Sequence, residues 1–166
     1  MATKNLTERK AFVLTQKLQD ILNAYPTINK GGCGLFAKEL GMILQDKGYK
    51  VEVIILFAYR HCREDGNNFI SNNQLTKLYE SYYSWTHVML LVNGKYYIDS
   101  SGVYKDFKGW LDANRVIHRH RSRPFDLGFL NEFISDDYAD KWASQFDRGL
   151  MGEIKNKLKK SLEIFG

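Results

Sequence analysis

The sequence reads THVMLLVNGKYYID from Thr86 to Asp99. Two apolar runs flank the dipeptide Asn93-Gly94, which is a strong short-range signal for a β-hairpin because both residues tolerate a positive φ. We therefore predict a strand over 86–92, a turn at Asn93-Gly94 and a strand over 95–99. This antiparallel pair is the clearest β signal in the chain.

The length of the connecting loop decides which side chains of the hairpin share a face. A two-residue turn would pair Val88 with Asp99 and would place His87 and Asp99 on opposite faces. A three-residue loop over 92–94, with Gly94 left-handed, would place His87 directly opposite Asp99. We expect this second register, or a bulge with the same effect, because it brings an imidazole against a carboxylate.

The remaining pattern is mostly helical. The apolar, β-branched run over 51–57 predicts a buried strand, and a helix begins at about Cys33 and ends near Gly48. Helical spacing of apolar residues predicts further helices over residues 7–24, 74–83, 107–111, 127–134 and 136–165. The order of helices, antiparallel strands and helices predicts an α+β protein with a segregated sheet and a helical C-terminal segment.

Length and composition favour one domain over residues 1–166. The chain has 166 residues, of which 44% are hydrophobic and 14% aromatic, and its two prolines mark no linker. The amino terminus is polar and no apolar run approaches the roughly 20 residues of a membrane-spanning helix, so we expect a cytoplasmic protein with no membrane association. Cys33 and Cys62 are too few for a disulfide-stapled scaffold and are expected to be free thiols.

Three residues form a candidate active site. Cys33 follows Lys30-Gly31-Gly32 and lies where a helix begins, and a helix amino terminus favours the thiolate form of a cysteine. The backbone N–H groups of Cys33 and Gly34 are positioned to donate to an oxyanion. His87 can take the thiol proton and return it to a leaving group, and Asp99 can orient the imidazole. The predicted roles are nucleophile, general base and acid, and orienting carboxylate.

The segment GGCGLFA over 31–37, followed by Thr86-His87-Val88 and Tyr97-Ile98-Asp99, resembles the transglutaminase-like and arylamine N-acetyltransferase branch of the papain-like cysteine enzymes. The resemblance covers about residues 30–102. It implies a papain-like α+β core, with the nucleophile at a helix amino terminus packed on a small antiparallel sheet, and acyl-enzyme chemistry at Cys33.

Three further residues are candidate substrate contacts. Asn29 lies shortly before Cys33 and is a substitute for the glutamine that donates to the oxyanion in papain-type enzymes. Trp85 and Tyr83 lie just before His87 and are candidates for an aromatic wall beside the substrate, although core and rim packing is the commoner role of such residues. We expect no cofactor, and no metal site, because the remaining cysteine and histidines lack the ligand spacing of a zinc centre.

Each triad residue also has an ordinary structural explanation. Cys33 would be a small core residue at a helix start, His87 a satisfied histidine on a half-buried strand, and Asp99 a strand-end residue that bonds the following turn. The combination of the three, in this order, favours the catalytic interpretation. His61-Cys62 is a weaker rival, because adjacent residues of a strand point to opposite faces.

Lysine and arginine outnumber the acidic residues by 24 to 19, and the excess is uneven. The first cluster consists of Arg115, Arg119, Arg121 and Arg123, and the second of Lys155, Lys157, Lys159 and Lys160. The arginine cluster is a candidate site for a polyanion or an acidic protein partner. A solvated loop is the simpler explanation, and we favour it.

These observations predict a cysteine-dependent enzyme that acts on an amide or acyl group, in the first place a thiol peptidase or amidase. Acyl transfer to an amine, including transglutaminase or deamidase activity, is a close alternative because it uses the same acyl-enzyme. The alternatives from other classes are a non-catalytic binding module that uses the arginine cluster, and a nucleic-acid binder. The binding module predicts that the pocket is blocked or that His87 and Asp99 face apart.

Overall fold

The computed structural model describes residues 3–58, 84–114, 119–124 and 146–165. Its sheet has five strands in the order β4-β3-β2-β1-β5, and every neighbouring pair is antiparallel. The strands are β1 (Val51–Ala58), β2 (Ser84–Val92), β3 (Tyr96–Asp99), β4 (Gly102–Tyr104) and β5 (Arg119–Pro124). The α-helices are α1 (Glu8–Ala24), α2 (Cys33–Asp46), α5 (Phe107–Asn114) and α8 (Met151–Leu162). The predicted α+β class is confirmed.

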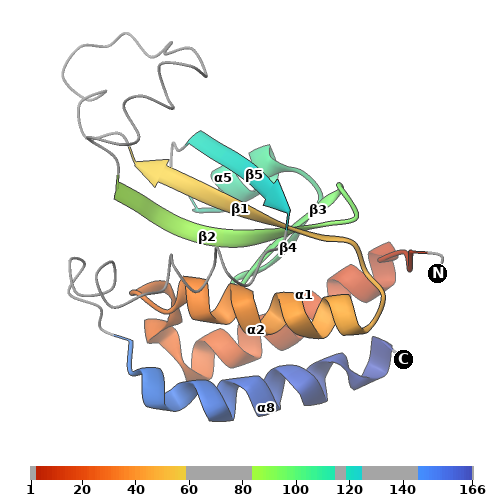
Figure 1. Ribbon diagram of the computed structural model, residues 1–166. Coiled ribbons are helices and arrows are strands. Elements are labelled where there is room, and N and C mark those ends of the chain that lie inside the picture. The colour runs from red at the N-terminus through yellow and green to blue at the C-terminus, as the bar shows by residue number, and fades with distance from the viewer. Residues whose placement is uncertain (1–2, 59–83, 115–118, 125–145, 166) are drawn as a thin grey trace, which may run out of the picture.

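The helices lie on both faces of the sheet. Figure 1 shows α1, α2 and α8 side by side below the sheet, and α5 on its other side. Successive residues of β2 divide between the two faces, so that Val88, Leu90 and Val92 pack toward the three-helix layer while Met89 and Leu91 pack toward α5. Because both faces are covered, the strand can be apolar without interruption.

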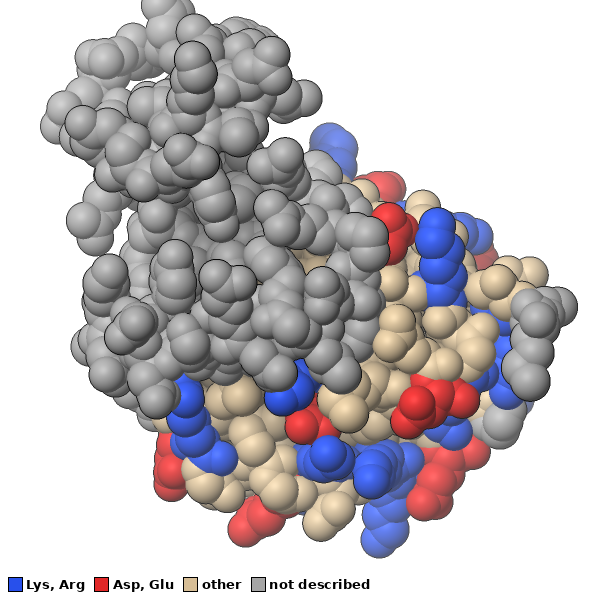
Figure 2. All heavy atoms as spheres, in the orientation of Figure 1, with Lys and Arg blue, Asp and Glu red and all other residues tan. Residues whose placement is uncertain are grey.

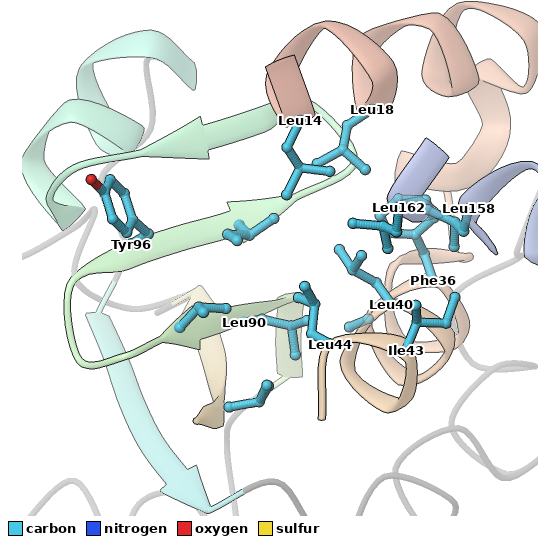
Figure 3. Close-up of a cluster of buried hydrophobic side chains, with 14 of the residues drawn as sticks. Leu14, Leu18, Phe36, Leu40, Ile43, Leu44, Leu90, Tyr96, Leu158 and Leu162 are labelled. Carbon is cyan, nitrogen blue, oxygen red and sulfur yellow. The ribbon is translucent and has the colours of Figure 1, made fainter. Parts of the chain in front are cut away.

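The main core lies between the sheet and the three-helix layer. Figure 3 shows side chains from α1, α2, α8 and β2 converging there, and each of those named here is 0–1% exposed: Leu14, Leu18, Phe36, Leu40, Leu44, Leu90, Leu158 and Leu162. Full burial of such a side chain stabilises the fold by about 1.5–3 kcal/mol. Their spacing of three to four residues explains why these segments are helical.

Helix α1 begins and ends close to the predicted positions 7 and 24. Thr7 is its N-cap, and the Thr7 hydroxyl accepts a hydrogen bond from the Lys10 N–H. The helix ends at Ala24 because Pro26, two residues later, disfavours helical backbone at Tyr25.

The register of the β2–β3 hairpin differs from both predicted registers. The observed pairs are Val92 with Tyr96 and Leu90 with Ile98, so the loop has three residues, as predicted, but it spans 93–95 instead of 92–94. The prediction that His87 lies directly opposite Asp99 is therefore wrong. Because the pairing moves by an even number of residues, the two side chains still share a face, as diagonal neighbours.

Contacts outside the hairpin explain this loop. Asn93 and Gly94 have φ values of 55° and 65°, as an Asn-Gly turn requires. The side chain of Asn93 donates to the Lys4 carbonyl and accepts from the Lys50 N–H, and its own N–H donates to the Lys50 carbonyl. These bonds hold Asn93 against the start of β1.

Strand β4 was not predicted, and it is short because α1 crosses beside it. Gly102 has a φ of 147°, and a Cβ atom there would lie 2.8 Å from Cγ2 of Thr15 on α1. The Thr15 hydroxyl accepts a hydrogen bond from the Val103 N–H at 3.0 Å and donates one to the Ala11 carbonyl. This close approach fixes β4, and with it the end of β3, against α1.

The arginine cluster was expected to be a solvated loop, and for residues 119–124 this is wrong. These residues form β5, whose backbone pairs with β1 and places Arg121 opposite Ile55 and Arg123 opposite Val53. Arg115 lies outside the described residues. So do the helices predicted over 74–83 and 127–134, and residues 136–145 of the last predicted helix. In the described part of that segment, α8 is flanked by the 3₁₀ turns η3 (Arg148–Leu150) and η4 (Glu163–Phe165), and residues 146–147 are not helical.

Charges of both signs lie side by side on the face shown in Figure 2. On α8 the residues Ile154, Leu158 and Leu162 are buried and Lys157, Lys159 and Lys160 are exposed, as on an ordinary amphipathic helix, whereas the half-buried Lys155 pairs with Glu39 of α2 at 2.9 Å. Within the described ranges, no helix combines the length and the apolar character needed to cross a membrane.

Candidate active site

Cys33 is the first residue of α2, as predicted, and is a free thiol with 6% of its surface exposed. The N-cap is Gly32, whose N–H donates to the Ile28 carbonyl and whose carbonyl accepts from the Phe36 N–H. Within the described residues, no side-chain hydrogen bond caps this terminus. The N–H groups of the first turn and the positive end of the helix dipole therefore lie at the terminus that carries Cys33.

The backbone just before Cys33 is packed against an aromatic ring. A Cβ atom on Gly32 would lie 2.6 Å from Cγ of Phe146, whose side chain is 6% exposed. Only glycine fits at this position without displacing the ring. Phe146 thus helps to hold the peptide that precedes the thiol.

His87 and Asp99 lie on neighbouring strands and are in direct contact. Nε2 of His87 is 2.8 Å from Oδ2 of Asp99, and their side chains are 13% and 3% exposed. Because Nε2 faces the carboxylate, Nδ1 is the ring nitrogen left for a second partner. The predicted pairing of imidazole and carboxylate is therefore present, in the register described above.

Asp99 accepts four hydrogen bonds. Oδ2 accepts from His87 and from the indole Nε1–H of Trp110 at 2.7 Å. Oδ1 accepts from the Ser101 N–H at 2.8 Å and from the Ser101 hydroxyl at 2.5 Å. Since that hydroxyl donates to the carboxylate, the Tyr104 hydroxyl, 2.8 Å away, donates to Ser101.

These contacts keep the carboxylate ionised. Burial alone would raise the pKa of Asp99, but the hydrogen bond and positive charge of His87, with the bonds from Ser101 and Trp110, hold that pKa below its usual value. The bonds to Ser101 also match the structural role considered from the sequence, in which Asp99 secures the turn after β3. Both roles are compatible in one residue.

The pKa of His87 is set by burial and by two partners. Burial lowers the pKa, but the hydrogen bonds to Asp99 and Cys33 and the charges of both groups raise it from 6.5 to about 10. The direct contact in this site is that between His87 on β2 and Asp99 on β3, and Cys33 on α2 enters through its effect on the pKa of His87.

Trp110 is the residue of this site that the sequence prediction missed. It lies on α5, is 4% exposed, and its ring stacks on His87 with centroids 5.5 Å apart and planes 19° apart. The sequence placed it only on an apolar helical stripe with Phe107, which is how a core residue looks. Nothing in the local pattern indicated that α5 covers the same sheet face as His87.

The candidate substrate contacts are only partly described. Asn29 ends the 3₁₀ turn η1 (Pro26–Asn29) and is exposed, and its Oδ1 accepts a 2.6 Å hydrogen bond from the hydroxyl of Ser100, which is 2% exposed. This bond joins the loop before Cys33 to the end of β3. Tyr83 lies outside the described residues, and of Trp85 the structure describes the backbone, which pairs with Phe57.

Within the described part of the chain, no group of three or more histidine, cysteine or acidic side chains could hold a metal ion. The arrangement that is present holds a protonated imidazole against a carboxylate, and it places Cys33 at a helix terminus whose N–H groups can donate to a developing negative charge.

No protein-family model matches this chain, and no curated protein and no solved structure is significantly similar to it. The resemblance to the papain-like enzymes therefore stays an expectation from the sequence motifs around Cys33, His87 and Asp99.

Proposed function

We propose that the protein is a cysteine-dependent enzyme that cleaves an amide or related acyl group through an acyl-enzyme, with hydrolysis as the first choice. The observation that carries this proposal is the coupling of three residues. His87 contacts Asp99 through Nε2 at 2.8 Å, and Asp99 and Cys33, at the start of α2, together raise the pKa of His87 to about 10. Such an imidazole is charged at neutral pH and can act as an acid toward a leaving group.

The first half of the reaction would form a thioester. The Cys33 thiolate attacks the carbonyl carbon, and the oxygen takes the electron pair next to the N–H groups of Cys33 and Gly34. His87 then gives its proton to the nitrogen of the leaving amine, and the carbon–nitrogen bond breaks. The products of this step are the acyl group on Cys33, the free amine and a neutral imidazole.

The second half would restore the enzyme. The neutral His87 accepts a proton from water as the water oxygen attacks the thioester carbon, and the thiolate leaves. The acid product departs, and the thiolate and imidazolium are again paired. If an amine attacks in place of water, the same steps give acyl transfer, so the identity of the acceptor is what separates the two alternatives.

The rival from another class, a non-catalytic binding module, predicts either that the pocket is blocked or that His87 and Asp99 face apart. Their contact at 2.8 Å favours the enzyme over this rival. A role for the arginine cluster in binding a polyanion or acidic protein stays a prediction. Residues 119–124 of this cluster form β5 at the edge of the sheet.

The proposal is tested by alkylating the two cysteines with iodoacetamide at a series of pH values and locating the label by mass spectrometry. We expect wild-type Cys33 to be labelled at pH 6, where an ordinary thiol hardly reacts, and we expect this labelling to be lost in His87→Ala. Cys62 in the same molecule is the reference thiol, and its rate should be the same in both proteins.

A His87→Gln variant guards against misfolding, because glutamine keeps the polar character and much of the volume of the side chain. Circular dichroism and the Tm of each variant show whether it is folded. Equal labelling of Cys33 and Cys62 at every pH in the folded wild type would contradict the proposed function.

A further inference from the structure

Trp110 contacts both partners of the candidate nucleophile. Its indole N–H donates to Oδ2 of Asp99 at 2.7 Å, and its ring stacks on the imidazole of His87 at 5.5 Å. Oδ2 is the same oxygen that receives His87 Nε2 at 2.8 Å. The side chain of Trp110 therefore contacts both of the groups that the His87–Asp99 hydrogen bond joins.

The hydrogen bond from Trp110 completes the fixation of the Asp99 carboxylate. Oδ1 is held by the N–H and the hydroxyl of Ser101, which restrains one end of the group. Without a donor from α5, Oδ2 would have His87 alone, and a rotation of the carboxylate would weaken that bond. With Trp110 in place, both oxygens are directed, and the lone pair that meets Nε2 has a fixed orientation.

The ring of Trp110 acts on the imidazole itself. Its plane lies 19° from that of His87, so the face of the indole is turned toward the imidazole. The face of an aromatic ring attracts a cation, and the attraction is strongest where water is excluded. Trp110 is 4% exposed, and Phe107, one helical turn earlier, stacks on it at 5.9 Å and keeps its ring in place.

We infer that Trp110 is a positioning residue of the active site, which acts through Asp99 and His87 and not on the substrate. It holds the carboxylate in line with Nε2 and supports the charged form of the imidazole from its face. This inference rests on the proposed function, in which His87 works as a charged acid. It also assigns a role to α5, since this helix delivers the indole to the sheet face that carries His87 and Asp99.

The test is a pH titration of the His87 ring resonances by NMR in the wild type, Trp110→Leu and Trp110→Phe. Leucine removes both contacts, and we expect the His87 pKa to fall by roughly one unit and the low-field Nε2–H signal to be lost to exchange with water. Phenylalanine keeps an aromatic face but lacks the N–H, and we expect an intermediate titration with a weakened Nε2–H signal.

Leu91→Ala is the matched control for packing. Leu91 belongs to the same apolar cluster as Trp110, and its truncation should lower the Tm while leaving the His87 titration unchanged. If folded Trp110→Leu and Trp110→Phe both titrate like the wild type, Trp110 is a packing residue and the inference is wrong. The NMR titration reports on His87 and does not require a reactive Cys33. An unreactive Cys33 would therefore count against the proposed function but would leave this test valid.

Discussion

At the scale of single residues, Asp99 gathers the polar contacts of the site. It is 4% exposed, and its two oxygens accept hydrogen bonds from His87, Trp110 and Ser101. A buried carboxylate is stable only when such donors satisfy it. The charge of Asp99 is thus maintained by its neighbours, and its hydrogen bond to His87 is the largest of the contributions that raise the pKa of His87.

Replacement of Asp99 by asparagine should lower the pKa of His87. Burial lowers the pKa of His87 in the wild type, and the hydrogen bond and the charge of Asp99 help to raise it to about 10. Loss of a charge-assisted bond corresponds to roughly 1–2 pKa units. An NMR titration of the histidine resonances measures this shift, with the His87→Gln variant identifying the signal of His87. An unchanged midpoint in Asp99→Asn would show that the carboxylate does not control the imidazole.

The same shift predicts how stability depends on pH. Because the folded-state pKa of His87 is raised from 6.5 to about 10, the protonated group stabilises the fold fully below pH 6.5 and loses this effect as the pH rises through about 10. The free energy of unfolding should therefore fall over this interval, and less steeply in His87→Gln. Urea denaturation at a series of pH values measures the two slopes, and equal slopes would contradict the assignment.

Gly32 offers a second test at a single position. An alanine Cβ would collide with the ring of Phe146 at 2.6 Å, so Gly32→Ala should cost about 1–3 kcal/mol of stability and should slow the labelling of Cys33. Gly152→Ala on α8 is the control, because a Cβ there meets nothing within 4 Å and alanine favours a helix. Urea denaturation compares the two, and equal effects would mean that the Phe146 contact is not tight.

At the scale of elements, the sequence predicted what depends on local pattern and missed what depends on tertiary contacts. Helices α1 and α2 and strands β1 to β3 follow from apolar spacing and from Asn93-Gly94. The register of the hairpin did not follow, because Lys4 and Lys50 fix Asn93 from outside it. Strand β5 reads RHRSRP and lacks the apolar residues of a strand signal, so pairing with β1 forms it against its propensity.

The candidate site divides in the same way. Cys33, His87 and Asp99 could be proposed from residue type, order and the glycines around Cys33. Trp110 could not, because its role requires knowing that α5 packs on the sheet face opposite α1, α2 and α8. A tryptophan on an amphipathic helix carries no sign of a polar partner 11 residues earlier in the chain.

Helix α8 should be held by its apolar face and not by its charges. Leu158 is fully buried in the main core, whereas Lys159 next to it is exposed. Leu158→Ala should therefore cost about 2–5 kcal/mol of stability, while Lys159→Ala should stay within about 0.5 kcal/mol. Urea denaturation of the two variants checks this. A comparable loss in both would mean that the lysine-rich face contributes to the fold.

At the scale of the whole molecule, the site lies where three layers meet. The thiol comes from the three-helix layer, the imidazole and carboxylate from the sheet, and the indole from α5 on the other face (Figure 1). His87, Asp99 and Trp110 follow one another at intervals of 12 and 11 residues, whereas Cys33 lies far earlier in the chain, so the site exists only in the assembled fold. No short segment of the chain would bring these four side chains together.

We propose that Cys33, activated by His87, accepts an acyl group from the substrate. Trapping the acyl-enzyme on Cys33 tests this most directly. The protein is mixed with p-nitrophenyl acetate, quenched in acid and digested, and the acetyl group is located by mass spectrometry in the wild type and in His87→Gln. We expect rapid acetylation of wild-type Cys33, followed by hydrolysis of the acetyl group, and we expect both steps to be slower in His87→Gln. Acetylation of Cys33 no faster than that of Cys62, and unaffected by the change at His87, would contradict it.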